Sequence, residues 1–219
     1  MTRRRKKAPS QSSRTNWILG GVIGTVVVAA VVVVVIVFRG PWRVGAAKMI
    51  APADYDIVNS EEDVFHVSMP QGWIIKSGGR KDSTWMTAEK GGAKIKVNES
   101  LVGSLLGDIS GAGNSDPNGP DENLPVSRVH ETKQPIFAEE YGKYREELAT
   151  MVQSRFGKTR RSAFSGNEGG SRPVRGYRAT AMGAMTQITV VCTCSPGDWD
   201  VLEPAFAKVI TSIGPGQSH

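Results

Sequence analysis

The chain has 219 residues, a formal net charge of +6 and two cysteines. This length is sufficient for one ordinary domain together with additional segments. Nine of the 27 Lys and Arg residues lie within residues 1–50, which contain no acid, so the remainder holds 18 bases against 21 acids. Because the remainder is weakly acidic, the basic composition does not indicate nucleic-acid binding, and we predict no nucleic-acid partner.

The basic N-terminus precedes residues 17–38, a stretch without any charged side chain. As a helix its 22 residues span about 33 Å, which is sufficient to cross a bilayer. Trp17 and Trp42 are placed where aromatic residues meet the membrane interface. A cleaved signal peptide is the alternative, with small residues at 44–47, but its apolar region is normally shorter. We therefore predict an uncleaved membrane anchor.

Charge on either side of the apolar stretch predicts its orientation. Six bases precede residues 17–38 and three follow them, which favours a cytoplasmic tail at 1–16 and an extracytoplasmic chain from Arg39. The predicted location is a bacterial inner membrane, with the C-terminal domain facing the periplasm. Gly20 and Gly24 form a small-xxx-small pair that could pack two such helices into a homodimer, although such pairs also occur by chance.

Beyond a linker at 39–55, one domain is predicted over 56–213, followed by a tail at 214–219. Alternating apolar residues predict a strand over 64–69 that ends at a Pro-Gly turn, and two strands that flank the Lys-Gly-Gly of 90–92. A helix weakened by glycines follows at 100–110, and residues 111–125 are turn formers and acids typical of a flexible loop.

The second half begins with a predicted amphipathic helix at 135–157. Its apolar stripe recurs at three- and four-residue steps: Phe137, Tyr141, Tyr144, Leu148, Met151 and Val152. Strands are expected at 158–166, 175–183 and 185–194. In the last of these, Ile188, Val190, Cys192 and Cys194 share one face. A closing helix at 198–213 has Asp198 as its N-cap, with Pro204 causing a kink or a later start near Glu203. Its predicted apolar stripe is Leu202, Phe206, Val209, Ile210 and Ile213. The predicted fold class is α+β, an antiparallel sheet covered by helices.

Three segments of this pattern resemble the PsbP/Mog1-like superfamily. They are the strand that ends in MPQGW at 69–73, the run GYRATAMGAMTQITVVCTC at 176–194 and the closing helix. The resemblance covers Asp56 to Ile213 and implies an α/β/α sandwich in which Trp73 covers the sheet. It also implies an accessory or partner-binding role, because the family has no shared catalytic motif to transfer.

Chemical motifs give little support to an enzyme. Cys192 and Cys194 are either two small core residues or, in an exported domain, an oxidisable pair. The three histidines, at 66, 130 and 219, lack the spacing of metal ligands. Residues 114–125 imitate half a calcium loop but end in Pro125 where a glutamate is required. We predict no metal and no cofactor.

One basic cluster remains as a candidate site. Between residues 155 and 178, seven Lys or Arg side chains face a single acid, Glu168. If the strands are neighbours, five of them could form an anion- or partner-binding surface: Arg160, Arg161, Arg172, Arg175 and Arg178. The alternative is a solvated sheet edge whose charges discourage aggregation.

The preferred hypothesis is a membrane-anchored module that binds a protein partner and has no catalytic site of its own. A hydrolase is the alternative, with Glu61, Glu62 and Asp63 acting beside His66. An anion- or ligand-binding domain is a further alternative, through the basic cluster.

Overall fold

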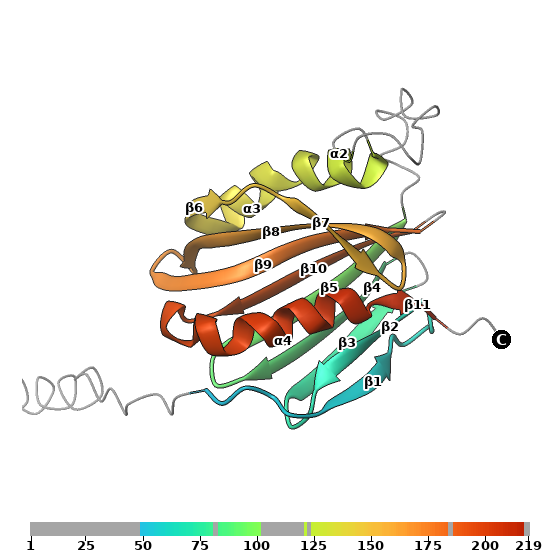
Figure 1. Cartoon of the computed structure of the whole chain (residues 1–219), viewed down its shortest axis with the longest axis horizontal. Helices are drawn as coiled ribbons and strands as arrows, with labels where there is room; N and C mark the ends of the chain where they lie inside the picture. The colour runs from blue at the N-terminus through green and yellow to red at the C-terminus, as the bar shows by residue number, and fades with distance from the viewer. Residues whose placement is uncertain (1–48, 81–82, 102–120, 122–123, 184–185, 217–219) are drawn as a thin grey trace, which may run out of the picture. The chain divides into compact units, whose positions relative to one another are not determined.

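The computed structural model describes residues 49–80, 83–101, 121, 124–183 and 186–216 (Figure 1). The predicted tail at 1–16, the anchor at 17–38 and most of the loop at 111–125 lie outside these residues. No helix within the described ranges combines the length and the apolar character needed to cross a membrane. The predicted helix at 100–110 also lies outside them, apart from its first two residues, which end a strand.

The main sheet has eight strands, and every pairing in it is antiparallel, as predicted. Its strand order is β3-β4-β5-β10-β9-β8-β6, and β7 pairs with β8 beside β6. The strands are β3 (Ile74–Arg80), β4 (Ser83–Lys90), β5 (Ala93–Leu101), β6 (Tyr141–Glu146), β7 (Thr150–Ser154), β8 (Gly157–Glu168), β9 (Arg172–Met182) and β10 (Thr186–Cys194). A smaller sheet has the order β1-β2-β11. Its strands are β1 (Tyr55–Asn59), β2 (Phe65–Pro70) and β11 (Gly214–Pro215), so the predicted tail begins within the sheet.

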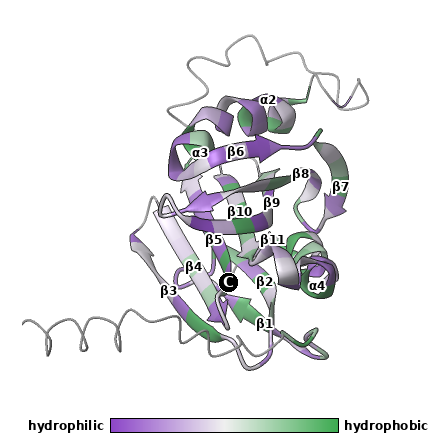
Figure 2. Cartoon of the chain, turned by 90° about the vertical axis from the view of Figure 1, so that its left-hand side faces the viewer, coloured by the Kyte–Doolittle hydropathy of each residue, from purple (hydrophilic) through white to green (hydrophobic). Residues whose placement is uncertain are grey.

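Helices lie on both faces of the main sheet (Figures 1 and 2). On one face, α2 (Pro125–Thr132) and α3 (Gln134–Glu140) pack over β6, β8 and β9. On the other, the 3-10 turn η5 (Pro196–Asp198) leads into α4 (Trp199–Ser212), which contacts β2, β7, β9 and β10. Figure 2 shows both apolar and polar residues on α4, as expected for a helix with one buried side.

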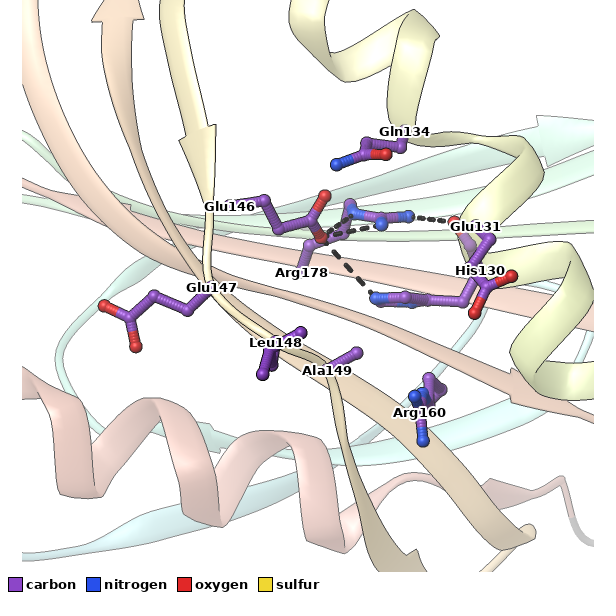
Figure 3. Close-up of a pocket in the computed structure, with 9 residues that line it drawn as sticks. All are labelled: His130, Glu131, Gln134, Glu146, Glu147, Leu148, Ala149, Arg160 and Arg178. Atoms are coloured by element: carbon purple, nitrogen blue, oxygen red, sulfur yellow. Dashed lines mark hydrogen bonds and ion pairs between the residues drawn. The ribbon is translucent and has the colours of Figure 1, made fainter. Parts of the chain in front are cut away.

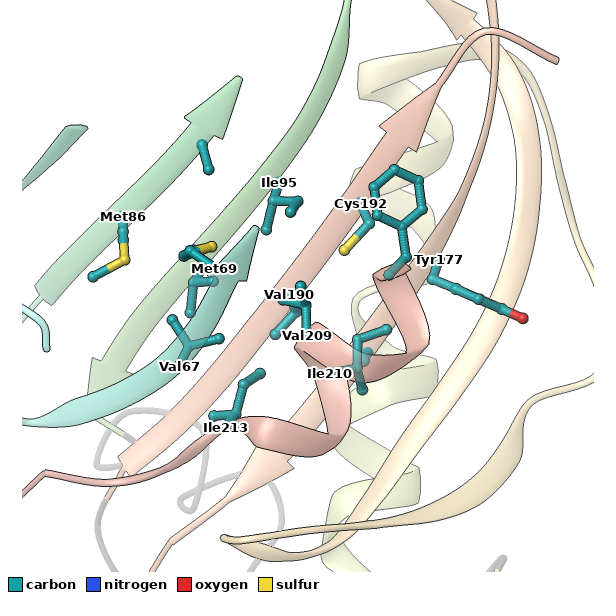
Figure 4. Close-up of a cluster of buried hydrophobic side chains, with 14 of the residues drawn as sticks. Val67, Met69, Met86, Ile95, Tyr177, Val190, Cys192, Val209, Ile210 and Ile213 are labelled. Carbon is teal, nitrogen blue, oxygen red and sulfur yellow. The ribbon is translucent and has the colours of Figure 1, made fainter. Parts of the chain in front are cut away.

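Strand β10 divides its side chains between two cores because successive residues point to opposite faces. Ile188, Val190, Cys192 and Cys194 belong to the large core beneath α4 and β2 (Figure 4), which confirms their predicted shared face. Val191 belongs to a smaller cluster with Phe137, on the α2–α3 side. The central strand is therefore buried on both faces, which explains its nearly continuous apolar sequence.

The hairpin between β4 and β5 is confirmed. Lys90 pairs with Ala93, and Gly91 and Gly92 between them have φ of +56° and +87°, a backbone conformation that favours glycine. The turn after β2 likewise uses Gly72 at a φ of +72°. It brings Trp73 into the large core, where only 7% of the residue is exposed. The proline turn therefore buries the tryptophan, as predicted.

The predicted helix at 135–157 is wrong beyond Glu140. Residues 141–146 form β6, whose pairing with β8 shifts register between Gly142 and Arg145, and Lys143 has a φ of +55°. Leu148, expected on the buried stripe, is 95% exposed. Glycine at 142 weakens a helix, whereas pairing with β8 satisfies the backbone and buries Tyr141 against Phe164, with ring centroids 5.2 Å apart.

The closing helix begins at Trp199, not near Glu203, and Pro204 lies inside it. Asp198 makes no side-chain cap hydrogen bond; its carboxylate instead accepts hydrogen bonds from Met49 N and Ser195 Oγ. The predicted apolar stripe is fully buried: Leu202, Phe206, Val209, Ile210 and Ile213. Packing of this stripe outweighs the loss of one backbone hydrogen bond at the proline.

Candidate functional site

The structure distributes the five predicted arginines over two faces of the sheet. Arg160 and Arg161 are consecutive on β8 and therefore point to opposite sides. By the same alternation on β9, Arg172 and Arg178 share the α2–α3 face with Arg160, and Arg175 shares the α4 face with Arg161. The five side chains therefore do not form one surface, because they are divided between the two faces of the sheet.

Arg178 is buried beneath α2, with 1% of its side chain exposed. Its Nε and Nη2 lie 2.8 and 2.6 Å from Glu146 Oε1, and its Nη1 donates to the backbone carbonyl of His130 at 2.6 Å (Figure 3). Each of the three guanidinium nitrogens therefore contacts a group of this chain. Arg178 therefore acts within the fold.

His130 completes this buried network from α2. Its Nδ1 lies 3.0 Å from Thr180 Oγ1 and its Nε2 lies 2.9 Å from Ser162 Oγ. Ser162 Oγ also donates to Glu146, whose Oε1 is 3.6 Å from His130 Nε2. Four elements thus meet in one polar cluster: α2, β6, β8 and β9.

The charges of the cluster are fixed by its surroundings. Burial opposes ionisation of Glu146, but hydrogen bonds from His130 and Ser162 and the charge of Arg178 outweigh it and lower the pKa of Glu146 to about 2. Burial and then the neighbouring Arg178 charge lower the pKa of His130, despite the hydrogen bond to Glu146. The cluster therefore contains a carboxylate, a guanidinium and a neutral imidazole at neutral pH.

This cluster superficially resembles a serine nucleophile beside a histidine, but its geometry is that of a structural network. Ser162 is 2% exposed and His130 is 1% exposed, and the serine hydroxyl donates to a carboxylate. A nucleophilic serine needs its proton directed to the base and needs access to substrate. We infer that the cluster fastens α2 to the sheet.

The α4 face carries a different arrangement, which we call the arginine face: Arg145, Arg161 and Arg175. Arg145 pairs with Ser165 on β8, and Ser165 pairs with Arg175 on β9. The side chains of Arg145, Ser165 and Arg175 therefore stand side by side across the three strands. A pocket of about 410 Å³ opens here, lined by Arg145, Glu146, Glu147, Phe164, Ser165 and Arg175.

Aromatic rings hold two of these arginines in place. The guanidinium of Arg161 lies 4.5 Å from the ring centroid of Tyr177, and that of Arg175 lies 4.8 Å from the ring of Trp199. Tyr177 and Trp199 are themselves buried, with centroids 5.0 Å apart. Stacking of this kind fixes the plane of a guanidinium and leaves its edge free to donate hydrogen bonds. Among the described residues, Arg175 forms one ion pair, with Glu147 at 3.5 Å.

The remaining candidates are not gathered into a site. Glu61 and Glu62 are exposed in the turn between β1 and β2, and the ring of His66 accepts a contact from Arg155 Nη1 at 3.2 Å. Arg172 is exposed and pairs with Glu168. Within the described ranges, no group of three or more His, Cys, Asp or Glu side chains is placed to hold a metal ion.

The two cysteines are free, buried thiols. Burial, together with the charge of Asp198, raises the pKa of Cys194 to about 12, and burial also raises the pKa of Cys192. Cys194 Sγ donates to the backbone carbonyl of Arg175 at 3.8 Å. Both side chains therefore behave as core residues, protonated at neutral pH.

Sequence reasoning missed His130, Glu146 and Ser162. Their partners are separated by 16 to 50 residues in sequence and come from four elements, so no local motif marks them. It also missed Arg145, because the predicted helix placed this residue outside the sheet. Only the pairing of β6 with β8 brings Arg145 beside Arg175.

No family model and no curated protein sequence matches this chain. Among solved structures, the chain is similar to the cyanobacterial PsbP (CyanoP) from Synechocystis, at 14% identity and a TM-score of 0.49, over 74% of this chain and 93% of that one. It is also similar to the protein of unknown function PA94 from Pseudomonas aeruginosa, at 11% identity and a TM-score of 0.39, over 76% and 100% of the two chains.

A third similar structure is LpqN of Mycobacterium tuberculosis, described as involved in cell envelope biogenesis. It has 10% identity and a TM-score of 0.37, over 76% of this chain and 80% of that one. CyanoP and LpqN both have the PsbP/Mog1-like fold, which is the resemblance predicted from the sequence. With TM-scores below 0.5, these likenesses carry no function to this chain.

Proposed function

We propose that this protein is a partner-binding accessory module without a catalytic site of its own. In this proposal residues 17–38 anchor it to a membrane, its domain lies outside the cytoplasm, and the arginine face binds an acidic segment of a protein partner. The observation that carries the proposal is the row Arg145, Ser165 and Arg175 at the open pocket, with Arg161 and Arg175 stacked on buried aromatic rings.

The geometry of the arginine face suits carboxylate recognition. Guanidinium groups pair with carboxylates through two parallel hydrogen bonds, and arginine is enriched in the cores of protein interfaces. Because stacking already restricts Arg161 and Arg175, less side-chain entropy is lost when a partner binds. A partner carboxylate would displace Glu147 from Arg175. The two side chains lie 3.5 Å apart, and 66% of the Glu147 side chain is exposed.

The hydrolase alternative has weaker support. Its carboxylates at Glu61 and Glu62 are exposed, and in the buried pair of Ser162 and His130 the serine hydroxyl donates to the carboxylate of Glu146. A general acid or base needs a pocket that perturbs its pKa and receives substrate. We therefore propose binding and not catalysis as the activity of this domain.

Charge reversal on the arginine face is expected to abolish partner capture. Crosslinking in native membranes followed by mass spectrometry should recover one consistent protein with the unchanged chain. With Arg145→Glu and Arg175→Glu together, the recovery should fall at least tenfold, since both carboxylate-pairing groups become repulsive. The matched control is Lys76→Glu with Arg80→Glu on β3, two exposed bases at the opposite edge of the same sheet.

The control variant should retain the partner. Equal capture by both double variants would remove the arginine face from the proposal. Purification of the unchanged chain always alone would contradict partner binding itself.

The proposed topology predicts that a reporter fused after His219 is active only if it requires export. The physical reason is the excess of six bases before residues 17–38 over three after them. A second reporter that works only in the cytoplasm, fused at the same site, provides the comparison. Activity of the cytoplasmic reporter alone would reverse the orientation and would direct the search toward intracellular partners.

A further inference from the structure

A separate pocket of about 270 Å³ opens on the α2–α3 face (Figure 3). It lies between the helices and the segment that joins β6 to β7. Its wall contains Glu131 and Gln134 from the helical side, Leu148 and Ala149 from the joining segment, and Arg160 from β8. The Glu146–Arg178 pair contributes to its lining as well.

Arg160 is the guanidinium of this pocket that has no ion pair among the described residues, and the exposed carboxylates of Glu131 and Glu147 line the same pocket. Glu146 and Arg178 neutralise each other at 2.6 Å. The guanidinium of Arg160 forms no ion pair or hydrogen bond among the described residues, and its Nε is buried without a partner. In Figure 3 no dashed line reaches Arg160. A buried N–H donor without an acceptor is destabilising, so this Nε favours a ligand that supplies an acceptor.

We propose that this pocket binds a small organic monocarboxylate. Its carboxylate accepts hydrogen bonds from Arg160, and its apolar part lies against Leu148 and Ala149. The guanidinium presents a planar fork that matches a carboxylate. Leu148, at 95% exposure, is an apolar side chain that a ligand would cover.

The acidic side chains at the rim of the pocket disfavour ligands that carry more than one negative charge. Glu131 and Glu147 are exposed beside the opening, and each would repel a second negative charge on the ligand. This repulsion disfavours inorganic phosphate and dicarboxylates. Since Arg160 points to the opposite side of β8 from Arg161, its guanidinium is not part of the arginine face, although the two pockets share Glu146 and Glu147.

Ligand-observed NMR on the full chain in mild detergent tests the proposal. Butyrate is the probe, butyramide is its neutral counterpart, and inorganic phosphate is the competitor of higher charge. Arg160→Gln removes the proposed carboxylate partner, and Arg80→Gln, at an exposed arginine on β3, is the matched control. Leu148→Asp is a second variant at an exposed position where folding is not at risk.

Butyrate is expected to bind the unchanged chain and the Arg80→Gln variant. Its affinity should fall at least tenfold in Arg160→Gln and in Leu148→Asp, and butyramide should bind at least tenfold more weakly than butyrate. Absence of butyrate binding would overturn the proposal. So would equal binding of butyrate and butyramide, preferential binding of phosphate, or butyrate binding that persists in Arg160→Gln.

Discussion

Replacing Arg178 with methionine is expected to lower the free energy of unfolding by about 3–5 kcal/mol, because it leaves the Glu146 carboxylate buried without its counter-ion. Both side chains are nearly inaccessible, with 1% and 5% exposed. The change also removes the donor to the His130 carbonyl, and so loosens α2. Urea unfolding of the full chain, followed by far-ultraviolet circular dichroism, measures this loss.

Two control variants distinguish the effect of breaking the buried ion pair from the effect of removing any arginine. Arg172→Met removes an exposed arginine of the same strand that pairs with Glu168, and should cost about 1 kcal/mol or less. The double change Glu146→Gln with Arg178→Met removes both buried charges, and should cost less than Arg178→Met alone. If Arg178→Met were no worse than Arg172→Met, the proposed role of the network in holding α2 would be wrong.

The same network predicts how stability depends on pH. The pKa of Glu146 is about 2 in the folded chain against an ordinary 4.5, so its contribution is complete above pH 4.5 and is lost as the pH falls toward 2. The shift corresponds to about 3 kcal/mol. His130 acts in the same direction: its folded pKa is lowered, so below about pH 6.5 the unfolded chain binds the proton more strongly.

Stability should therefore decline in two stages on acidification, first through His130 and then through Glu146. Urea unfolding between pH 7 and pH 2 measures both stages. In the variant that combines Glu146→Gln with Arg178→Met, the loss of stability below pH 4.5 should be absent. If that loss persists in the variant, it arises from other carboxylates and not from Glu146.

The parts of the fold that the sequence predicts are those in which a local pattern and the tertiary environment agree. The alternation of β10 continues through Cys194, and the glycines of the β4–β5 turn have the backbone conformations that such a turn requires. The stripe on α4 is buried along its length. In each case, neighbouring residues alone carry enough information to specify the element.

Residues 135–157 show where this agreement ends. Tyr141, Tyr144 and Leu148 fit helical spacing, yet β8 offers a free edge whose hydrogen-bonding groups can be satisfied by residues 141–146. That edge belongs to a strand that follows later in the chain, so its influence is invisible to a local pattern. The same dependence on distant strands hides the buried network and the arginine face, because both are assembled by pairing register.

Trp73 offers the sharpest test of the opening turn of the domain. It belongs to the large core with Met69 and Met86, and 7% of it is exposed. Trp73→Ala is expected to lower the free energy of unfolding by about 3–5 kcal/mol, since it removes a buried aromatic side chain and leaves a cavity. Urea unfolding followed by circular dichroism measures the loss without depending on tryptophan fluorescence.

Trp85 is the matched control because it is the same residue type on β4, at 38% exposure, on the opposite face of the sheet from the large core. Its ring covers Gly78 on the neighbouring strand. Trp85→Ala should cost about 1 kcal/mol or less, the range of a cross-strand pair. A small loss for Trp73→Ala would mean that the turn after β2 does not hold this side chain in the core. An equally large loss for Trp85→Ala would instead mean that the outer face of β4 is covered in solution.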